Sequence, residues 1–268
     1  MVDVQVQVEA AAAAAWPAGR TDTAAGWLLR HTPGVPRRRS NSALPPAPDR
    51  HPERTLEAVE AFYTAAGLPV AVQVSPAGRH RALDAALAAR GYRREAPTLV
   101  LVAPVGEVLV RTAPAADRGP GAAVTIGEAA DEAWASTYRS VHATVDTSAV
   151  VERVLARVPS PAAFARAEVA GRGVATGLFV ADGQWTGVFC MTTHPDHRRR
   201  GIARAILGAG ARWAAARGCA GLYLQVEQDN VAAREVYARS GFAHSHDYHY
   251  RVSDSPGRRH SSASTSAL

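Results

Sequence analysis

The pattern of apolar and polar residues over the first hundred positions changes between helical and strand spacing, which predicts a small α/β module. An alanine-rich helix comes first and ends at Pro17, because proline has no N–H to continue the hydrogen-bond ladder. The stretch 32–48 holds five prolines and the run Arg37-Arg38-Arg39, so an irregular, solvated segment is expected there. The predicted helices are 9–16, 56–63 and 79–90, and the predicted strands are 26–30, 69–74, 98–103 and 108–111.

A second, larger set of strand and helix patterns fills residues 122–252. Proline and glycine within 112–121 mark a linker in front of it, and no apolar periodicity follows Ser253, which predicts a disordered tail over 253–268. We therefore expect an N-terminal α/β module over 1–111 and a C-terminal domain over 122–252. The strands predicted in this domain are 122–126, 163–169, 174–180, 186–193, 222–226 and 242–252, and its helices are 131–144, 148–157, 201–217 and 230–240.

Composition narrows the possible chemistry. The 268 residues are 47% hydrophobic and 20% charged, as in ordinary globular proteins, and all 30 basic residues are arginines. Without lysine, neither Schiff-base catalysis on an internal amine nor a phosphate loop ending in Gly-Lys-Ser/Thr can occur. Arginine, alanine, glycine and proline are all abundant, as in a gene of high GC content, so codon usage accounts for the net charge of +6 without a nucleic-acid partner. Dispersed arginines with only 6% aromatic residues do not predict nucleic-acid binding.

The sequence favours a cytoplasmic protein. Cys190 and Cys219 lie in apolar surroundings, and one pair of cysteines is too few for a disulfide-built scaffold. The N-terminus contains Asp3 and Glu9 and has no basic start, unlike a secretory signal. No apolar run reaches the ~18 residues that a membrane span needs, so no membrane association is expected.

The most informative segment lies between residues 186 and 204. A predicted apolar strand runs into three arginines and then into Gly201-Ile202-Ala203, where a helix begins. The first N–H groups of a helix have no partner inside it, and together with the helix dipole they attract phosphate. Gly201 and Ala203 leave the backbone accessible, and the arginines add positive charge. These residues predict a site for an anion.

The spacing Arg198-x-x-Gly201-x-Ala203 resembles the Arg/Gln-x-x-Gly-x-Gly/Ala signature of the GNAT acetyltransferase superfamily. The stretch Asn230-x-x-Ala233-x-x-x-Tyr237-x-x-x-Gly241-Phe242 resembles the second diagnostic stretch of that family. The resemblance covers roughly residues 122–252. It implies a GNAT fold, an α/β fold whose mixed sheet splays open between its fourth and fifth strands, here 186–193 and 222–226.

The resemblance also implies that acetyl-CoA is the co-substrate and lies in that splay, with no metal. The residues implied for the pantetheine arm are Met191, Thr192, Thr193 and Asn230. Those implied for the pyrophosphate are Arg198, Arg199, Arg200, Gly201, Ile202, Ala203 and Arg204.

In such a site an amine attacks the thioester directly, so the amine needs a base and the departing sulfur needs a proton. The resemblance makes Tyr237 the proton donor; its structural alternative is a core tyrosine that packs the helix on the sheet. The fourth strand holds no carboxylate, although many family members have a glutamate there. Glu227 is therefore the first candidate base and Glu168 the second, with a solvated residue before the helix as the other interpretation of Glu227.

Other chemistries fit the residues less well. His244, His246 and His249 crowd the last strand, but alternation sends His249 to the opposite face, and no set of cysteines or carboxylates completes a metal site. Gly208-Ala209-Gly210 falls inside a helix and lacks the third small position of a dinucleotide motif, so close packing on the sheet is its expected role. The serine-hydrolase motif Gly-x-Ser-x-Gly is absent from the sequence.

The N-terminal module resembles a degenerate half of the same fold, because 89–92 echoes 239–242 and the phosphate-binding loop is missing. We expect it to cover an edge of the catalytic sheet or to line the acceptor pocket, with Trp27, Arg30 and Asn41 as contributors. Two functions stay open. One is an acetyl-CoA-dependent N-acetyltransferase acting on a primary amine of a small molecule or a protein; the other is a non-catalytic acyl-CoA-binding module. The sequence leaves the acceptor and the oligomeric state open.

Overall fold

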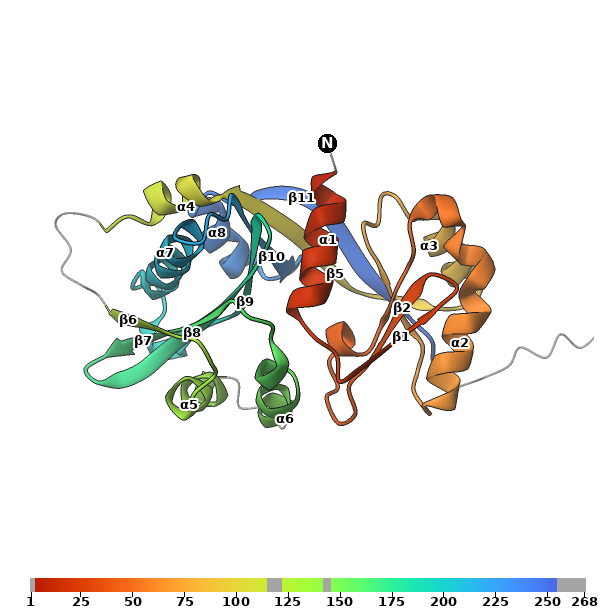
Figure 1. The fold of residues 1–268 in the computed structure, drawn as a ribbon, viewed down its shortest axis with the longest axis horizontal. Helices are drawn as coiled ribbons and strands as arrows, with labels where there is room; N and C mark the ends of the chain where they lie inside the picture. The colour runs from red at the N-terminus through yellow and green to blue at the C-terminus, as the bar shows by residue number, and fades with distance from the viewer. Residues whose placement is uncertain (1–2, 115–121, 142–145, 255–268) are drawn as a thin grey trace, which may run out of the picture.

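A computed structural model describes residues 3–114, 122–141 and 146–254, and within them eleven strands form one continuous sheet (Figure 1). The expected mixed α/β sheet is confirmed, and its strand order is β1-β2-β3-β4-β11-β5-β10-β9-β8-β7-β6. The strands are β1 (Arg20–Ala24), β2 (Trp27–His31), β3 (Ala43–Leu44), β4 (Ala71–Val74), β5 (Arg93–Pro104), β6 (Ala123–Gly127), β7 (Ala162–Val169), β8 (Arg172–Asp182), β9 (Trp185–Thr193), β10 (Gly221–Glu227) and β11 (Ala243–Val252). The α-helices are α1 (Val4–Ala15), α2 (Leu56–Ala65), α3 (Arg81–Ala89), α4 (Val105–Thr112), α5 (Glu132–Val141), α6 (Asp146–Arg153), α7 (Ile202–Ala215) and α8 (Val231–Arg239).

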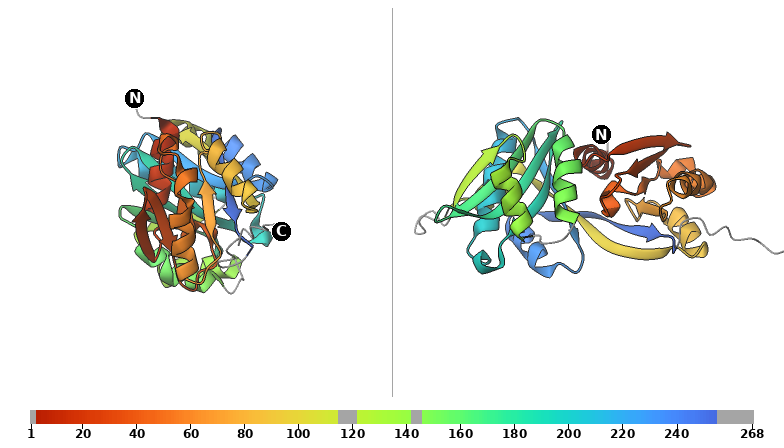
Figure 2. Two further views of the ribbon diagram at one scale, coloured as in Figure 1. Left: turned by 90° about the vertical axis from the view of Figure 1, so that its right-hand side faces the viewer. Right: turned by 90° about the horizontal axis from the view of Figure 1, so that it is seen from below.

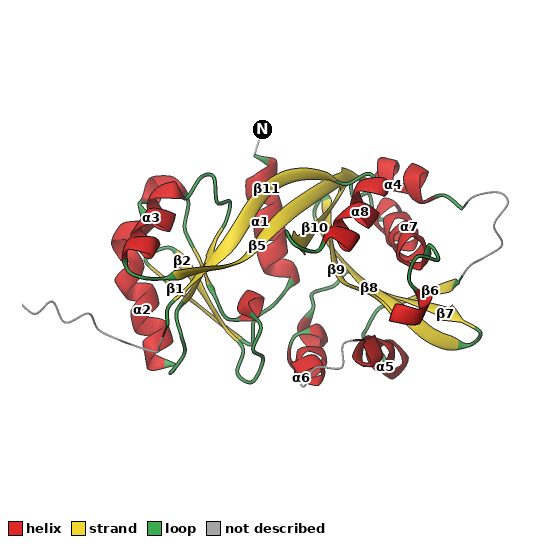
Figure 3. Ribbon diagram, turned by 180° about the vertical axis from the view of Figure 1, so that it is seen from behind, coloured by secondary structure: helices red, strands yellow, loops and turns green. Residues whose placement is uncertain are grey.

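The two halves of the chain exchange strands at the centre of the sheet. The N-terminal half runs β4–α3–β5 and the C-terminal half runs β10–α8–β11, so β5 and β11 occupy equivalent places in the two halves. Strand β5 pairs antiparallel with β10, strand β11 pairs antiparallel with β4, and the two long strands also pair with each other. Figure 3 shows both strands running from one half to the other. Each half therefore completes its sheet with a strand of the other.

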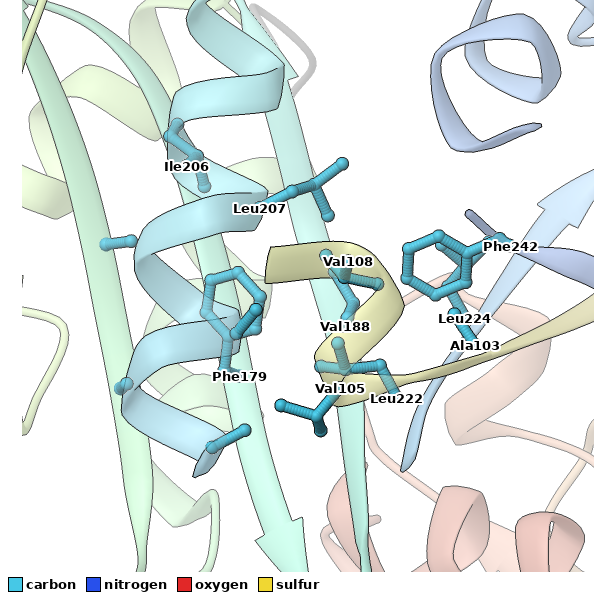
Figure 4. Packing of buried hydrophobic residues seen from close by; sticks show 14 of the residues in the cluster. Ala103, Val105, Val108, Phe179, Val188, Ile206, Leu207, Leu222, Leu224 and Phe242 are labelled. Atoms are coloured by element: carbon cyan, nitrogen blue, oxygen red, sulfur yellow. The ribbon is translucent and has the colours of Figure 1, made fainter. Parts of the chain in front are cut away.

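The sheet of the C-terminal half is covered on both faces. Helix α7 packs on β7, β8 and β9 with α4 beside it, and α1 and α5 pack on the opposite face. The buried residues form two cores, one on each face. The α7-side core includes Phe179, Ile206, Leu207, Leu222 and Phe242 (Figure 4). The α5-side core includes Val8, Trp16, Trp134, Tyr138, Phe189, Tyr223, Tyr248 and Tyr250.

Helix α1 begins the chain but packs on the C-terminal half. Its buried residue Val8 belongs to the α5-side core, and the helix contacts β8 and β9. At its first turns, the Gln7 Oε1 oxygen accepts hydrogen bonds from Gln184 Nε2 at 2.7 Å and from Trp185 Nε1 at 3.0 Å. The N-terminal sequence thus contributes both a strand and a covering helix to the C-terminal half.

The N-terminal half has a core of its own, made by β2–β4, α2 and α3. Its buried side chains include Trp27, Leu29, Tyr63, Leu83 and Leu87. Seen from below in Figure 2, β5 and β11 join this half to the other. The small α/β module predicted for the N-terminal sequence is therefore present, although its sheet is continuous with that of the C-terminal half.

The strand expected at 108–111 is wrong, because these residues belong to helix α4. Val105, Val108 and Thr112 are buried at helical spacing, whereas Val110 is 72% exposed. A run of β-branched residues favours a strand locally, and packing of one helical face against α7 overrides that preference. Strand β1 was not predicted, since its residues are polar and mostly exposed at the sheet edge.

The glycines of α7 have the packing role expected from the sequence. A Cβ atom on Gly210 would overlap the ring of Phe179 on β8, and one on Gly208 would lie 2.8 Å from Thr112 Oγ1 on α4. The helix therefore approaches both neighbours more closely than any side chain at these positions would permit.

Parts of three sequence expectations fall outside the described residues. These are the linker at 115–121, the end of the predicted helix at 142–145 and the tail at 255–268. Within 3–114, 122–141 and 146–254, none of the helices is both long and apolar enough to cross a membrane.

Candidate functional site

Strands β9 and β10 pair at one end and separate at the other. Their parallel register runs from Trp185–Gly221 to Val188–Leu224 and stops there. Residues 189–193 of β9 and 225–227 of β10 have no backbone pairing with each other. The splay predicted between the fourth and fifth strands of the C-terminal domain therefore exists, and it exposes the backbone edge of β9.

A bulge shapes that edge. The pairing of β9 with β8 shifts by one residue after Phe189, where Cys190 takes a left-handed φ of 50° and its carbonyl accepts a hydrogen bond from Thr176 Oγ1 at 3.1 Å. Burial raises the pKa of the Cys190 thiol to about 12, so the thiol is protonated at neutral pH. Met191, Thr192 and Thr193 follow the bulge along the unpaired edge of the splay.

The loop after β9 presents a helix N-terminus beside the splay. Arg198 Nε donates to the Thr193 carbonyl at 3.2 Å, which folds the arginine back on the strand end. Arg199 and Gly201 take left-handed φ values of 59° and 80°, and α7 then begins at Ile202. A Cβ on Gly201 would find no atom within 4 Å, so the space in front of the helix is open.

The first turn of α7 has the features of an anion site. Its leading N–H groups, on Ile202, Ala203 and Arg204, precede the first i→i−4 bond of the helix, in which Ala205 N donates to Gly201 O. The exposed side chains of Arg199 and Arg200 lie in the same loop. Arg204 is directed elsewhere, because its Nη2 donates to the Ala113 carbonyl at 2.7 Å. Backbone donors and positive charge thus converge at one end of the splay.

Helix α8 contributes Asn230 and Tyr237. The Asn230 side chain caps the helix by accepting a hydrogen bond from Ala233 N at 3.2 Å. The Tyr237 ring packs on the α7-side core and meets Phe242 edge-on at a centroid distance of 5.9 Å. Burial raises the pKa of Tyr237 to about 12. Its hydroxyl hydrogen-bonds to no residue in the described part of the chain.

The two candidate bases have different surroundings. Glu227 is the exposed last residue of β10, and its carbonyl accepts a hydrogen bond from Asn230 N. Glu168 lies on β7, three strands from β10, where its carboxylate pairs with Arg166. Glu227 therefore stands at the splay and Glu168 does not.

A cavity of about 340 Å³ opens on the α5-side face next to the splay, and we call it the central cavity. Both halves of the chain form its walls. The lining residues are Trp16, Pro36, Arg37, Arg38, Arg39, Ala96, Thr98, Tyr138, Val150, Gln225, Glu227, Tyr248 and Tyr250. The N-terminal half therefore lines a pocket at the splay, one of the two roles expected for it.

The residues suggested from the sequence for that wall are not the ones that form it. Trp27 is fully buried in the N-terminal core. Arg30 is buried and donates to Ser42 and Gln73, lining only a neighbouring space of about 10 Å³. Asn41 supports the wall from behind, since its Nδ2 donates to the carbonyls of Val35 and Arg37. The wall is instead formed by Arg37, Arg38 and Arg39, which were expected to lie in an irregular, solvated segment.

The three histidines of β11 each pair with a different carboxylate. His246 pairs with Glu9 at 2.8 Å, His249 with Asp84 at 2.7 Å and His244 with Asp247 at 2.8 Å. In the residues that the structure describes, no group of three histidine, cysteine or acidic side chains is arranged to hold a metal ion.

Most of the chain is similar to proteins described as N-acetyltransferases. A family model described as "Probable histone acetyltransferase Rv0428c C-terminal" matches residues 5–251. The relative named "Uncharacterized N-acetyltransferase YobR" from Bacillus subtilis (strain 168) is 27% identical over 248 residues, which are 92% of this chain and 97% of the relative.

Solved structures show the same fold. A GCN5-related N-acetyltransferase from Kribbella flavida aligns with a TM-score of 0.69 at 17% identity, covering 96% of this chain and 97% of its own. A tandem GNAT protein from the clavulanic acid biosynthesis pathway aligns with a TM-score of 0.63 at 14% identity, covering 87% of this chain and 79% of its own. The likeness to a tandem protein agrees with the two equivalent halves joined by exchanged strands.

Fold and sequence together define an N-acetyltransferase of the GNAT type. The chain belongs to the family described as "Probable histone acetyltransferase Rv0428c C-terminal", whose model spans almost all of it.

Proposed function

We propose that the protein transfers the acetyl group of acetyl-CoA to a primary amine, of a small molecule or a protein, by direct attack of the amine on the thioester. The main support is the arrangement around the splay. The anion-binding start of α7 lies at its end, an unpaired strand edge runs along it, and the central cavity opens on its α5-side face.

The acetyl-CoA side would use backbone groups more than side chains. Gly201 with the N–H groups of Ile202 and Ala203 suits a pyrophosphate, and the guanidinium groups of Arg199 and Arg200 add charge. Arg198 and Arg204 are proposed to hold the loop, in view of their hydrogen bonds to the Thr193 and Ala113 carbonyls.

The unpaired edge of β9 suits the amide groups of the pantetheine arm. The residues proposed there are Met191, Thr192 and Thr193. Asn230 is proposed to act indirectly, because its side-chain oxygen already accepts the Ala233 N–H at the start of α8.

The amine side would use the central cavity. In the transfer, the amine nitrogen forms a bond to the acetyl carbon, the carbon–sulfur bond breaks, the nitrogen loses one proton and the sulfur gains one. Glu227 is the proposed acceptor of the first proton and Tyr237 the proposed donor of the second. Alignment of the two reactants contributes most of the acceleration, up to ~7–11 kcal/mol, so a single exposed carboxylate suffices as base.

The test is calorimetric titration with acetyl-CoA followed by a screen of primary amines for CoA release. Binding together with turnover of at least one amine is expected. Tight binding without turnover on amino acids, polyamines, aminoglycosides or peptides would favour the non-catalytic acyl-CoA-binding module. No binding at all would overturn the proposal. A cytoplasmic location is also proposed, because Cys190 and Cys219 are free thiols.

A further inference from the structure

The wall of the central cavity has an excess of positive charge. Arg37, Arg38 and Arg39 line it from the N-terminal half, and Glu227 is the one carboxylate among its described lining residues. Arg38 forms an ion pair with Glu95, which also pairs with Arg93 and does not line the cavity. Two guanidinium groups therefore remain against one carboxylate.

Arg37 and Arg39 have no carboxylate partner within the described chain. The exposed Arg37 side chain makes no hydrogen bond or ion pair there. Arg39 is half-buried, lies 5.6 Å from the ring centroids of both Trp16 and Phe189, and lines the cavity together with Tyr248. Aromatic faces hold the Arg39 guanidinium in place while leaving its charge uncompensated.

The segment that carries these arginines is fixed in place. Asn41 accepts a hydrogen bond from Thr32 N at 2.8 Å and donates to the Arg37 carbonyl at 3.0 Å. Ser40 Oγ, one residue past the run, accepts a hydrogen bond from Trp16 Nε1 at 3.0 Å. These contacts fix the backbone from which the two arginines project, and the planar guanidinium group matches the paired oxygens of a carboxylate or phosphate.

We propose that the acceptor is a small primary amine that also carries an oxyanion, a carboxylate or a phosphate, bound by Arg37 and Arg39 with its amine toward Glu227. This inference rests on the proposed function and adds the substrate class. Tyr138 and Tyr248 supply flat surfaces for an apolar body, and a volume of about 340 Å³ suits a small ligand. A lysine-rich peptide would instead face two uncompensated positive charges, which disfavours it.

The experiment compares amines that differ only in the anionic group. The pairs are phenylalanine with phenethylamine and phosphoethanolamine with ethanolamine, together with a lysine-rich peptide, and CoA release gives kcat and KM for each. We expect kcat/KM to be at least tenfold higher for at least one anionic member than for its partner, and the two pairs separate carboxylate from phosphate recognition. Equal or better turnover of the members that lack the anionic group, or of the peptide, would overturn the inference.

Substitutions of Arg37 and Arg39 test whether these residues cause the preference for an amine that carries an oxyanion. Arg37→Gln should raise KM at least tenfold for the amine that carries the oxyanion and change KM less than twofold for its partner without that group. Arg39→Lys keeps the positive charge but removes the planar guanidinium, so it tests bidentate recognition. Arg81→Gln is the control, because Arg81 is an exposed arginine on α3 outside the central cavity. A preference that survives Arg37→Gln and Arg39→Lys intact would contradict the proposed site.

A binding measurement separates this inference from the proposed function. N-acetylphenylalanine and N-phenethylacetamide, which differ only in the carboxylate, are titrated into the wild type and the Arg37→Gln variant. Tighter binding of the carboxylate compound that depends on Arg37 supports the oxyanion site even if no amine is turned over. Equal binding of both compounds counts against it even if turnover is observed.

Discussion

Glu227 and Tyr237 lie on opposite faces of the central sheet. Side chains alternate along β10, so Leu222, Leu224 and Val226 enter the α7-side core while Gln225 and Glu227 line the central cavity. Tyr237 packs on the α7-side core. The proposed base and the proposed acid therefore lie on different sides of the sheet.

Replacing the Tyr237 hydroxyl should slow the chemical step without weakening acetyl-CoA binding. We expect Tyr237→Phe to lower kcat roughly 10²-fold or more, because a positioned proton donor typically contributes ~10²–10⁴-fold. Since the pKa of Tyr237 is raised to about 12, the hydroxyl stays protonated throughout an assay between pH 6 and about 9. Steady-state kinetics checks this expectation. The control is Tyr92→Phe, because the Tyr92 hydroxyl donates a hydrogen bond to Glu60 in the N-terminal half. An unchanged kcat would remove Tyr237 from the chemistry.

Neutralising Glu227 should also lower kcat. We expect Glu227→Gln to reduce kcat roughly 10- to 100-fold while the KM for acetyl-CoA changes less than threefold, because the side chain faces the cavity and not the α7 loop. The matched control is Glu235→Gln on α8, an exposed glutamate that pairs with Arg239. Equal activities of the two variants would leave the reaction without its proposed base.

The open space at Gly201, and not only its left-handed backbone conformation, should be required for acetyl-CoA binding. Gly201 and Gly183 both have left-handed φ values, 80° and 56°, and open space around the missing Cβ. Valine at either position strains the backbone by at least ~1–2 kcal/mol, so similar losses of Tm are expected. Only Gly201→Val should weaken acetyl-CoA binding at least tenfold in a calorimetric titration. Equal affinity in both variants would argue against a pyrophosphate at the start of α7.

Asp84 on α3 contacts His249 and Arg251 on β11, and we call this cluster the β11–α3 anchor. It should make the free energy of unfolding depend on pH. Asp84 Oδ1 accepts hydrogen bonds from Arg251 Nε and His249 Nε2, each at 2.7 Å. Burial alone raises the pKa of Asp84, but these hydrogen bonds outweigh it and lower that pKa below 3.8. Burial lowers the pKa of His249 below 6.5. Both groups bind fewer protons in the folded state than in the unfolded state, so stability should fall as pH drops below 6.5 and again below 3.8.

Asp84→Asn tests the same anchor. The substitution should cost about 1–3 kcal/mol at pH 7, because Arg251 loses a charged partner. The difference from the wild type should be fully present above pH 3.8 and shrink as pH falls through the lowered pKa. Urea denaturation at several pH values measures it. A constant difference down to pH 3 would show that the Asp84 charge does not stabilise the fold.

The exchanged strands predict that neither half folds alone. Fragment 1–114 would lack β11 beside β4, and fragment 122–254 would lack β5 beside β10 as well as the α1 cover. We expect each fragment to remain unfolded by circular dichroism and the mixture to co-purify as one folded species. Cooperative thermal unfolding of either isolated fragment would disprove this dependence.

Much of the fold and of the α7 loop could be predicted because their signals are local. The alternation in β8 and β9, the caps of α7 and α8 and the glycine at 201 are all set by neighbouring residues. The insertion of β5 between β10 and β11 has no such signal, since it joins residues more than a hundred positions apart.

The wall of the central cavity was missed for the same reason. Arg39 gains its role from Phe189 and Tyr248, which the sequence cannot bring near it. Trp27 and Asn41 were plausible by residue type, yet one is a core side chain and the other a support behind the wall. Glu227, predicted as the base from its position at the end of an apolar strand, is the last residue of β10 and lines the central cavity, and its role as base stays a prediction.

The continuous sheet that joins the two halves has a consequence for the shape of the central cavity. Because β4, β11, β5 and β10 are paired side by side, no hinge separates the N-terminal wall of the cavity from the C-terminal one. Domain closure is therefore not available for adjusting the pocket to differently sized molecules. If the proposed acceptor site is right, substrate range would instead be adjusted by substitutions in the segment 36–39, which lines the central cavity and lies apart in the chain from the loop after β9.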